Sequence, residues 1–282
     1  MVKVQDGCDC RCTYCIVPLV RGGARSVPVE AAEAAVRAAA EAGAAEVVLT
    51  GVDLGAWGKE TGDDLAGLLS RLVGLGTGLR FRLSSVEPHG LTDRLVGLMA
   101  DSPDVCPHLH VPLQSGSDRV LAAMGRPYDS VSFAAAIGRA AGRVPGLALG
   151  MDVICGFPGE DEAAFEATRS LIAALPFTYL HVFPFSPRPG TPAASMPGAA
   201  PRTERDRRCR VLRGTSSAAR AEHASSLVGR NVEVVDVRGR SEGVESLAAD
   251  YTRVMRPGVQ EPRPGRFEVK VAAADGAAAV AG

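Results

Sequence analysis

Apolar positions in the first 190 residues recur with two alternating periods, which predicts strands and helices in turn. Short, nearly continuous apolar runs are typical of buried strands, and the longer segments between them repeat every three or four residues, as helices do. The strand-like runs are Val2–Gly7, Glu46–Gly51, Arg80–Glu87, His108–Leu113, Leu147–Phe157 and Tyr179–Ser186. The helix-like segments are Pro28–Ala42, Asp63–Leu75, Leu91–Ala100, 117–124, 130–143 and Glu160–Leu175. Six β/α units predict a parallel sheet covered by helices, curved into an open partial TIM barrel because a closed barrel needs eight units.

The pattern changes after residue 186. The segment Ser186–Pro201 contains five prolines and is expected to be a loop, and Arg202–Leu227 reads as a charged amphipathic helix. Three short strand-like segments follow it, namely Asn231–Val237, Tyr251–Arg256 and Arg266–Ala272. We therefore expect a core over residues 1–200, a linking helix over 201–222, a small β-barrel over 223–275 and a frayed tail over 276–282.

The composition is that of a globular protein, with 46% hydrophobic and 22% charged residues. No apolar run approaches the roughly 18 residues of a membrane span and no signal peptide opens the chain, so we expect a cytoplasmic protein. The net charge of −1 hides an asymmetry: residues 1–200 carry 16 basic and 21 acidic residues, whereas 201–282 carry 15 and 11. This basic tail indicates a polyanionic partner, although a solvated helix followed by a small basic domain explains it equally well.

Four of the seven cysteines lie within eight residues, at Cys8, Cys10, Cys12 and Cys15. Their odd total, their crowding and the lack of a secretion signal favour a metal site over disulfides. The spacing C-x3-C-x2-C of Cys8, Cys12 and Cys15 can hold three corners of a [4Fe–4S] cube and leave the fourth iron open. A zinc site, the minor alternative, usually needs a second cysteine pair. Cys10 is poorly placed to reach the far corner, and we expect it to be a bystander.

The ends of the predicted strands carry the most unusual residues, and in parallel barrels the chemistry lies at those ends. Gly51 would let a ligand approach the backbone, or would simply serve a tight turn. An ionised Glu87 needs a partner, either a cofactor group or a basic side chain such as Arg80 or Arg82. Arg188 suits a carboxylate or an RNA phosphate, or is a solvent-exposed loop arginine. The candidate residues at the strand ends are Thr50, Gly51, Val52, Glu87, Gln114 and Arg188, and Asp152, which projects from the fifth predicted strand, is a further candidate.

His108 and His110 alternate with apolar residues on one predicted strand. Residues i and i+2 of a strand share a face, so we expect both histidines and Gln114 to face the barrel lumen. A His-x-His pair on a barrel strand is also found in divalent-metal hydrolases, which is an alternative function. Because no acidic ligand set accompanies the pair in the sequence, we expect hydrogen-bonded lumen histidines instead.

Seven segments of the core resemble one known family. They are Val4–Pro18, Leu49–Gly55, Leu83–Pro88, Cys106–Ser117, Asp152–Glu160, His181–Ser186 and Arg188–Pro192. Together they are similar to the radical S-adenosylmethionine tRNA methylthiotransferases. The Thr-Gly-Val-x-Leu-Gly and Cys-Pro-His-Leu-His runs look most like the branch that acts on threonylcarbamoyladenosine in tRNA. Branches acting on isopentenyladenosine in tRNA or on a ribosomal protein are the alternatives.

This resemblance implies that Cys8, Cys12 and Cys15 hold a [4Fe–4S] cluster and that S-adenosylmethionine chelates its open iron. Reductive cleavage would then give a 5′-deoxyadenosyl radical for the 2-methylthiolation of threonylcarbamoyladenosine next to the anticodon. The implied partners are tRNA, an electron donor such as flavodoxin or ferredoxin, and a sulfur donor. The expected cofactor-binding residues are Tyr14, Thr50, Gly51, Val52, Glu87, Gln114, Asp152 and Arg188.

The basic tail resembles a TRAM domain, a small β-barrel that holds RNA mainly through its phosphates. The candidate RNA-binding residues are Arg230, Arg238, Arg240, Arg253 and Arg256.

The chain departs from this family in one respect. Family members carry an N-terminal domain whose three cysteines bind an auxiliary iron–sulfur cluster, whereas this chain opens at Met1 inside the first predicted strand. Cys106, Cys155 and Cys209 lie on separate predicted elements and do not look like a replacement set. The chain is therefore a fragment, or the missing domain is supplied separately, or the full reaction is lost. A non-catalytic RNA-binding remnant is a further alternative.

Overall fold

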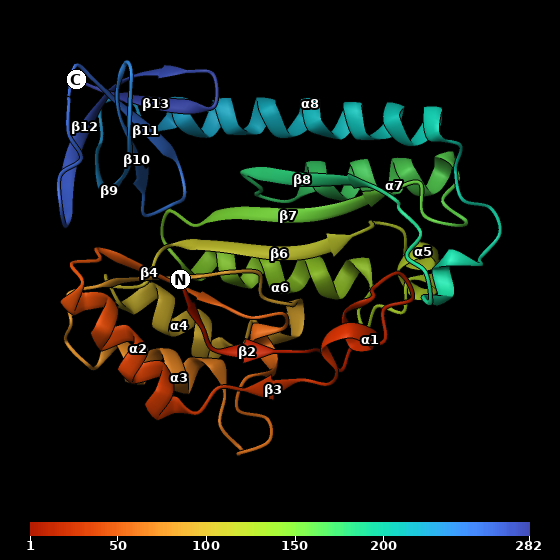
Figure 1. The fold of residues 1–282 in the computed structure, drawn as a ribbon. Helices are drawn as coiled ribbons and strands as arrows, with labels where there is room; N and C mark the ends of the chain where they lie inside the picture. Colours follow the sequence, from red (N-terminus) through yellow and green to blue (C-terminus); the bar gives the residue numbers. More distant parts are fainter.

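The computed structural model describes all 282 residues and shows a helix-covered parallel core followed by a small β-barrel (Figure 1). Three core strands, β1 (Val2–Lys3), β4 (Glu46–Thr50) and β5 (Arg80–Leu83), form one parallel sheet in the order β1-β4-β5. The other three, β6 (His108–Gln114), β7 (Ala148–Cys155) and β8 (Tyr179–Pro184), form a second parallel sheet in the order β6-β7-β8. Isolated parallel bridges Phe81–Val105 and Ser85–His110 connect the two sheets. The predicted parallel α/β arrangement is thus confirmed.

Four of the seven core helices begin at a residue whose side chain satisfies a free backbone N–H group. The side chains of Asp64, Thr92, Asp129 and Asp161 each accept a hydrogen bond from the first turn of the helix that follows. The core helices are α1 (Val17–Arg21), α2 (Val29–Glu41), α3 (Leu65–Val73), α4 (Asp93–Asp101), α5 (Asp118–Ala123), α6 (Ser130–Arg143) and α7 (Glu162–Ala174). Their apolar sides join the strands in a cluster of 40 buried residues. None of the helices combines the length and the hydrophobicity that a membrane span requires.

Two predicted strands of the core differ most from those in the structure. The segment Val2–Gly7 divides into β1 and β2 (Gln5–Asp6), and β2 leaves the parallel sheet to pair with β3 (Arg25–Ser26). Gly7 makes this possible, because its φ is +69° and a Cβ there would lie 1.9 Å from the carbonyl oxygen of Gly23. The predicted strand Arg80–Glu87 ends at Leu83, and the chain then enters the short 3₁₀ helix η2 (Pro88–Gly90).

The C-terminal region is a single long helix and a closed barrel. Helix α8 (Arg202–Ser226) lies along β8, and the five barrel strands close in the order β10-β11-β13-β12-β9 (Figure 1). Their bounds are β9 (Asn231–Arg240), β10 (Gly243–Ala248), β11 (Arg253–Pro257), β12 (Arg266–Asp275) and β13 (Ala278–Ala281). A core of seven buried residues fills the barrel.

Two features of this barrel correct the sequence predictions. Strand β10 lies in a stretch for which we predicted no strand. The tail 276–282, expected to be frayed, contains β13, which pairs with both β11 and β12 and closes the barrel. Alanine has a low strand propensity, so the Ala-rich end of the chain carries no strand signal. Its small side chains nevertheless fit the interior, where Ala279 is fully buried.

Two buried arginines join the barrel to the core. Arg80, at the start of β5, is completely buried and bonds Glu46 of the core, Glu233 of the barrel and the carbonyl of Leu247. Arg82 donates in the same way to Glu46 and to the carbonyls of residues 248 and 249. The barrel therefore sits beside the amino end of β5, away from the cysteine loop.

Candidate functional site

The cysteine loop follows β2 and is attached to the core at several points. Cys12 is buried, and Cys8 and Cys15 are half-buried. The backbone N–H of Thr13 donates to the carbonyl of Met124 at 2.9 Å, and its hydroxyl donates to the carbonyl of residue 123 at 2.9 Å. The three cysteines of the C-x3-C-x2-C spacing are thus presented by one anchored loop.

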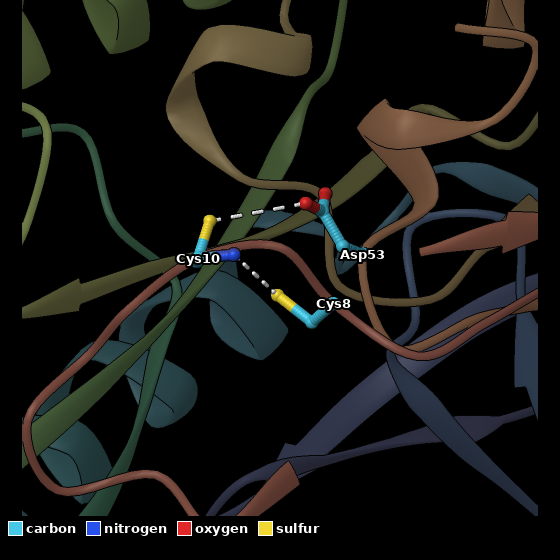
Figure 2. A group of neighbouring side chains, drawn as sticks. All are labelled: Cys8, Cys10 and Asp53. Carbon is cyan, nitrogen blue, oxygen red and sulfur yellow. Dashed lines mark hydrogen bonds between the residues drawn. The ribbon is translucent and has the colours of Figure 1, made fainter. Parts of the chain in front are cut away.

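Cys10 occupies a separate position in this loop, and Figure 2 shows its sulfur pointing toward Asp53. The Cys10 Sγ lies 4.0 Å from Asp53 Oδ2, and the Cys10 backbone N–H donates to Cys8 Sγ at 3.3 Å. The ligand atoms of Cys8, Cys10 and Asp53 all lie within 4.8 Å of one another. A hydrogen bond shared with the Cys8 sulfur raises the pKa of Cys10 and lowers the pKa of Cys8. The donor to the Cys8 sulfur in the structure is the Cys10 backbone N–H, whereas the Cys10 thiol is directed at Asp53.

A buried arginine that we did not predict contacts the loop. The Arg126 side chain donates from Nη1 to Cys12 Sγ at 3.1 Å and from Nε to the hydroxyl of Tyr128 at 2.9 Å. It also forms an ion pair with Glu87. Arg126 follows α5 and lies far from the cysteines in the chain, so neither spacing nor periodicity pointed to it.

Glu87 has a basic partner that we did not predict. We named a cofactor group or one of the arginines Arg80 and Arg82 as alternative partners of this carboxylate, but both arginines belong to the start of β5 and pair with Glu46. Glu87 lies beyond the other end of β5, where only Arg126 reaches it. Burial raises the pKa of Glu87, and the adjacent guanidinium opposes this shift.

The turn after β4 is built around a glutamine. The side-chain oxygen of Gln5 accepts hydrogen bonds from the backbone N–H groups of Val52 and Asp53, at 2.9 and 2.8 Å. A Cβ on Gly51 would lie 2.9 Å from the Cβ of Gln5. Gly51 is therefore required for packing within the chain, and a cofactor contact of Thr50, Gly51 and Val52 stays a prediction.

Four of the expected cofactor-binding residues line one cavity of about 460 Å³, namely Tyr14, Gln114, Asp152 and Arg188. They come from the cysteine loop, the end of β6, strand β7 and the proline-rich loop, and the rule that strand ends converge predicted this meeting. Gln114 has a φ of +65°, at a register shift between β6 and β7. Such a backbone conformation is uncommon outside glycine and is often found at functional sites.

The strand histidines lie in a buried hydrogen-bonded network, which confirms their expected role. The Tyr179 hydroxyl bonds His108 Nε2 at 2.9 Å and His110 Nδ1 at 3.1 Å, and His110 Nε2 bonds Asp152 Oδ1 at 2.8 Å. On β8, His181 Nδ1 lies 3.4 Å from the same carboxylate oxygen. Burial would raise the pKa of Asp152, but the bonds from the two histidines outweigh it and lower the pKa to about 2.

This network also corrects one sequence argument. We found no acidic residue to accompany the His-x-His pair, yet the fold brings Asp152 and His181 within 4.8 Å of His110. The strand register explains it, because Asp152 and His181 are paired residues of β7 and β8.

The candidate RNA-binding arginines mostly contact carboxylates of the barrel itself. Arg238 and Arg240 bond Glu245 at 3.1 and 2.5 Å, and Arg256 pairs with Asp236. The closest carboxylate to Arg253 is Glu245, at 3.9 Å, and Arg230 is exposed.

Sequence reasoning missed a further arginine near the barrel. The guanidinium of Arg220, on α8, lies 4.3 Å above the ring of Tyr179 and has no carboxylate within 4.0 Å. Together with Arg253 and Thr252 it lines a cavity of about 230 Å³ where α8, β8 and the barrel meet.

The comparisons with known proteins agree with this geometry. Residues 2–172 match the family model of the radical SAM superfamily, so the chain belongs to this superfamily. It is 38% identical over 251 residues to the threonylcarbamoyladenosine tRNA methylthiotransferase MtaB of Thermotoga maritima, covering 89% of this chain and 58% of that protein. It is 41% identical over 241 residues to the tRNA-2-methylthio-N(6)-dimethylallyladenosine synthase of a Parafrankia species, covering 84% and 49%. The chain thus spans about half the length of the curated relatives that it matches.

Solved structures with low sequence identity share the fold. The radical S-adenosylmethionine methyltransferase TsrM of Kitasatospora setae aligns with a TM-score of 0.58 at 17% identity, covering 68% of this chain and 35% of that one. Methylornithine synthase (PylB) aligns with a TM-score of 0.54 at 14% identity, covering 76% and 61%. The family resemblance that we inferred from the core motifs is confirmed.

Proposed function

We propose that the chain forms the radical core and RNA-binding barrel of a tRNA methylthiotransferase acting on threonylcarbamoyladenosine next to the anticodon. The observation that carries this proposal is the anchored cysteine loop beside a cavity in which Tyr14, Gln114, Asp152 and Arg188 converge. The relatives named above are tRNA methylthiolation enzymes. A divalent-metal hydrolase receives no support from them.

The cysteine loop fits a [4Fe–4S] cluster held by Cys8, Cys12 and Cys15. Thiolates are the usual ligands of such clusters, and the Arg126 guanidinium beside Cys12 offsets their negative charge. The Cys10 sulfur is directed at the Asp53 carboxylate, which supports Cys10 as a bystander. When bound, the cluster supplies the electron that cleaves S-adenosylmethionine.

The side chains of the adjoining cavity would bind and orient S-adenosylmethionine. Arg188 is suited to a carboxylate, because its guanidinium can form two parallel hydrogen bonds with it. The ionised Asp152 can accept a hydrogen bond from an ammonium or hydroxyl group. Glu87 acts through Arg126, which it holds against Cys12. The surrounding apolar side chains, such as Phe185, limit the access of water.

The six parallel strands would form an open partial barrel, with β1 and β8 at its free edges. The closed C-terminal barrel would be a TRAM-like RNA-binding module, joined to the core by α8.

We infer that Arg220, Arg230 and Arg253 contact RNA phosphates, because none of them is held closely by a carboxylate. An external electron donor of the flavodoxin or ferredoxin type and a sulfur donor complete the proposed partners.

The remaining cysteines are placed apart from the loop. Cys106 contacts Glu46 at 3.6 Å, whereas Cys155 on β7 and Cys209 on α8 are neighbours in the core. The family's auxiliary cluster needs three cysteines that act together. We infer that this chain generates the radical but does not insert sulfur by itself.

The test is an anaerobic incubation of the cluster-loaded chain with S-adenosylmethionine, a strong reductant and tRNA containing threonylcarbamoyladenosine. We expect 5′-deoxyadenosine, detected by chromatography, and no methylthio nucleoside in the digested tRNA. A Cys12→Ala variant is the control and should form neither product. If the loaded chain forms no 5′-deoxyadenosine, the proposed radical function is wrong. If the methylthio nucleoside appears, the inference about sulfur insertion is wrong.

A further inference from the structure

A second cavity, which we call the outer cavity, adjoins the cysteine loop and has a volume of about 750 Å³. It shares no lining residue with the cavity of Tyr14 and Arg188. Cys10 lines the outer cavity from the cysteine loop, Asp53 from the turn after β4, and His89 from η2. The proposed function gives none of these three side chains a role.

Asp53 is a buried carboxylate without a basic partner. Its side chain is 3% exposed, and no lysine or arginine nitrogen lies within 4.0 Å of its oxygens. The backbone N–H groups of Val52 and Asp53 donate to Gln5 and not to this carboxylate, and Asp53 Oδ1 has no hydrogen-bond partner. A carboxylate that is removed from water needs a cation beside it to keep its charge. The position is therefore suited to a positively charged ligand.

A thiol and an imidazole lie next to the two oxygens of this carboxylate. Cys10 Sγ is 4.0 Å from Asp53 Oδ2 (Figure 2), and His89 Nε2 is 3.9 Å from Asp53 Oδ1. Neighbouring ligand atoms of a tetrahedral zinc site are about 3.5 Å apart, because the bonds to zinc are about 2.0–2.3 Å long. Each pair therefore needs to close by only about half an ångström around an ion. The His89 side chain is 36% exposed, so its ring is free to make this adjustment.

Two short 3₁₀ helices bring Asp53 and His89 together. Asp53 directly precedes η1 (Leu54–Ala56), and His89 is the central residue of η2. A Cβ on Gly55 would lie 3.0 Å from the Cα of Gly90, so the two helices pack backbone against backbone. The carboxylate and the imidazole are thus held near each other by the fold.

The residues on either side of Cys10 are also fixed. Asp9 Oδ1 accepts a hydrogen bond from the backbone N–H of Ala24 at 3.0 Å. On the other side, a Cβ on Gly125 would lie 2.9 Å from the carbonyl oxygen of Arg11, which shows how closely the loop packs there. The Cys10 sulfur is therefore presented to Asp53 by a loop that is anchored at both neighbours.

Another thiol–carboxylate contact in the chain lacks the need for a cation. Cys106 Sγ lies 3.6 Å from Glu46 Oε2, but Arg80 and Arg82 already pair with that carboxylate. A thiol beside a carboxylate is thus not sufficient for a metal site. The lack of a basic partner for Asp53 and the presence of His89 distinguish the outer cavity.

We propose that Cys10, Asp53 and His89 bind a zinc ion at the wall of the outer cavity, separately from the iron–sulfur cluster. Sulfur, nitrogen and oxygen ligands of these three types are those that zinc accepts, and three protein ligands with one water give its usual four-coordination. Calcium and magnesium instead prefer oxygen ligands alone. The sequence contains no second cysteine pair for zinc, whereas the fold supplies a carboxylate and an imidazole from two other turns. The inference goes beyond the proposed function, because it uses none of the cluster or S-adenosylmethionine ligands.

The test counts metals on the full chain. The cluster-loaded chain is equilibrated with Zn²⁺, separated from free metal by gel filtration, and analysed for zinc and iron by mass spectrometry. We expect about one zinc per chain in addition to the cluster iron, as one four-coordinate site requires. When Co²⁺ replaces zinc, visible absorption should show a four-coordinate ion with a thiolate ligand. Neither measurement depends on enzymatic activity.

Three variants and a control locate the ion. Cys10→Ala and Asp53→Asn should each lose the zinc and the cobalt absorption and keep the iron. His89→Gln should weaken zinc binding about tenfold or more, since even residues that only support metal ligands contribute that much. Cys106→Ala is the matched control and should bind zinc as the wild type does. Circular dichroism confirms that each variant is folded.

Four results would overturn the inference. The first is a wild-type chain that retains no zinc, and the second is zinc retained in both Cys10→Ala and Asp53→Asn. The third is zinc that binds only without the cluster, which would assign the ion to the cluster cysteines, since Cys8 Sγ is within 4.8 Å of the same atoms. The fourth is loss of iron together with zinc in Cys10→Ala, which would assign Cys10 to the cluster. Zinc is counted separately from radical formation, so a failure of this site is distinguishable from a failure of the proposed function.

Discussion

The guanidinium of Arg126 lies 3.1 Å from the sulfur of Cys12, although 114 positions separate the two residues in the chain. Glu87 and Tyr128 hold the guanidinium in this place. A positive hydrogen-bond donor on a ligand sulfur stabilises the reduced, more negative state of an iron–sulfur cluster. The contact therefore links a loop of the core directly to the redox chemistry proposed for the cysteines.

Replacing Arg126 should make the proposed cluster harder to reduce. In Arg126→Gln the midpoint potential should shift to a more negative value, and cleavage of S-adenosylmethionine should slow about tenfold or more, while the iron content is retained. Potentiometric titration followed by electron paramagnetic resonance measures the shift. Arg139→Gln, at an exposed arginine of α6, is the matched control. An unchanged potential in Arg126→Gln would contradict the assignment.

The cysteines should divide into ligands and a bystander. Anaerobically reconstituted protein should contain about four irons per chain, as one [4Fe–4S] cluster does. Alanine at position 8, 12 or 15 should abolish the cluster absorption, because each change removes one of only three protein ligands. Cys10→Ala should retain it, because the Cys10 sulfur points toward Asp53. Loss of the cluster in Cys10→Ala would show that the ligand set is wrong.

The contribution of Asp152 to the stability of the chain should be lost in strongly acidic solution. Its pKa is lowered from 3.8 to about 2 in the fold, so the ionised carboxylate stabilises the folded state above pH 4 by about 2 kcal/mol. This contribution should disappear as the pH falls from about 4 to 2, where the carboxyl becomes protonated. Urea unfolding of the cluster-free chain should show Asp152→Asn less stable than the wild type at pH 6, with the difference shrinking toward pH 2. A difference independent of pH would contradict the role of the ionised carboxylate.

Binding of tRNA should depend on the arginines that have no close carboxylate. Arg220→Ala and Arg253→Ala should each weaken binding and reduce the slope of log affinity against log salt concentration by about 1, the loss of one phosphate contact. Arg256→Ala should instead destabilise the barrel, because Arg256 is held by Asp236 inside it. Arg37→Ala, on the exposed side of α2, is the control and should leave the salt slope unchanged. If all variants had the same slope of log affinity against log salt concentration, the RNA phosphates would contact residues other than Arg220 and Arg253.

Periodicity was sufficient to predict most of the core elements, because buried parallel strands and amphipathic helices leave strong patterns in a sequence, but it did not reveal the short elements α1 and β3. It failed at β13, where alanines fit the barrel interior without any strand signal. The convergence of strand ends agrees with the meeting of Tyr14, Gln114 and Arg188 at one cavity. Arg126 was missed as the basic partner of Glu87, because the contacts of a long arginine side chain depend on the three-dimensional fold and not on proximity in the sequence.

The burial of Arg80 and Arg82 between the core and the barrel has a consequence for the unfolding of the chain. Their charges are satisfied partly by Glu233 and by barrel carbonyls, so separating the two parts would leave buried guanidinium groups without those partners. Two regions with separate hydrophobic cores are thereby coupled in unfolding. The chain should melt in a single cooperative transition, and a protease acting on the native protein should not release the C-terminal barrel as a stable piece.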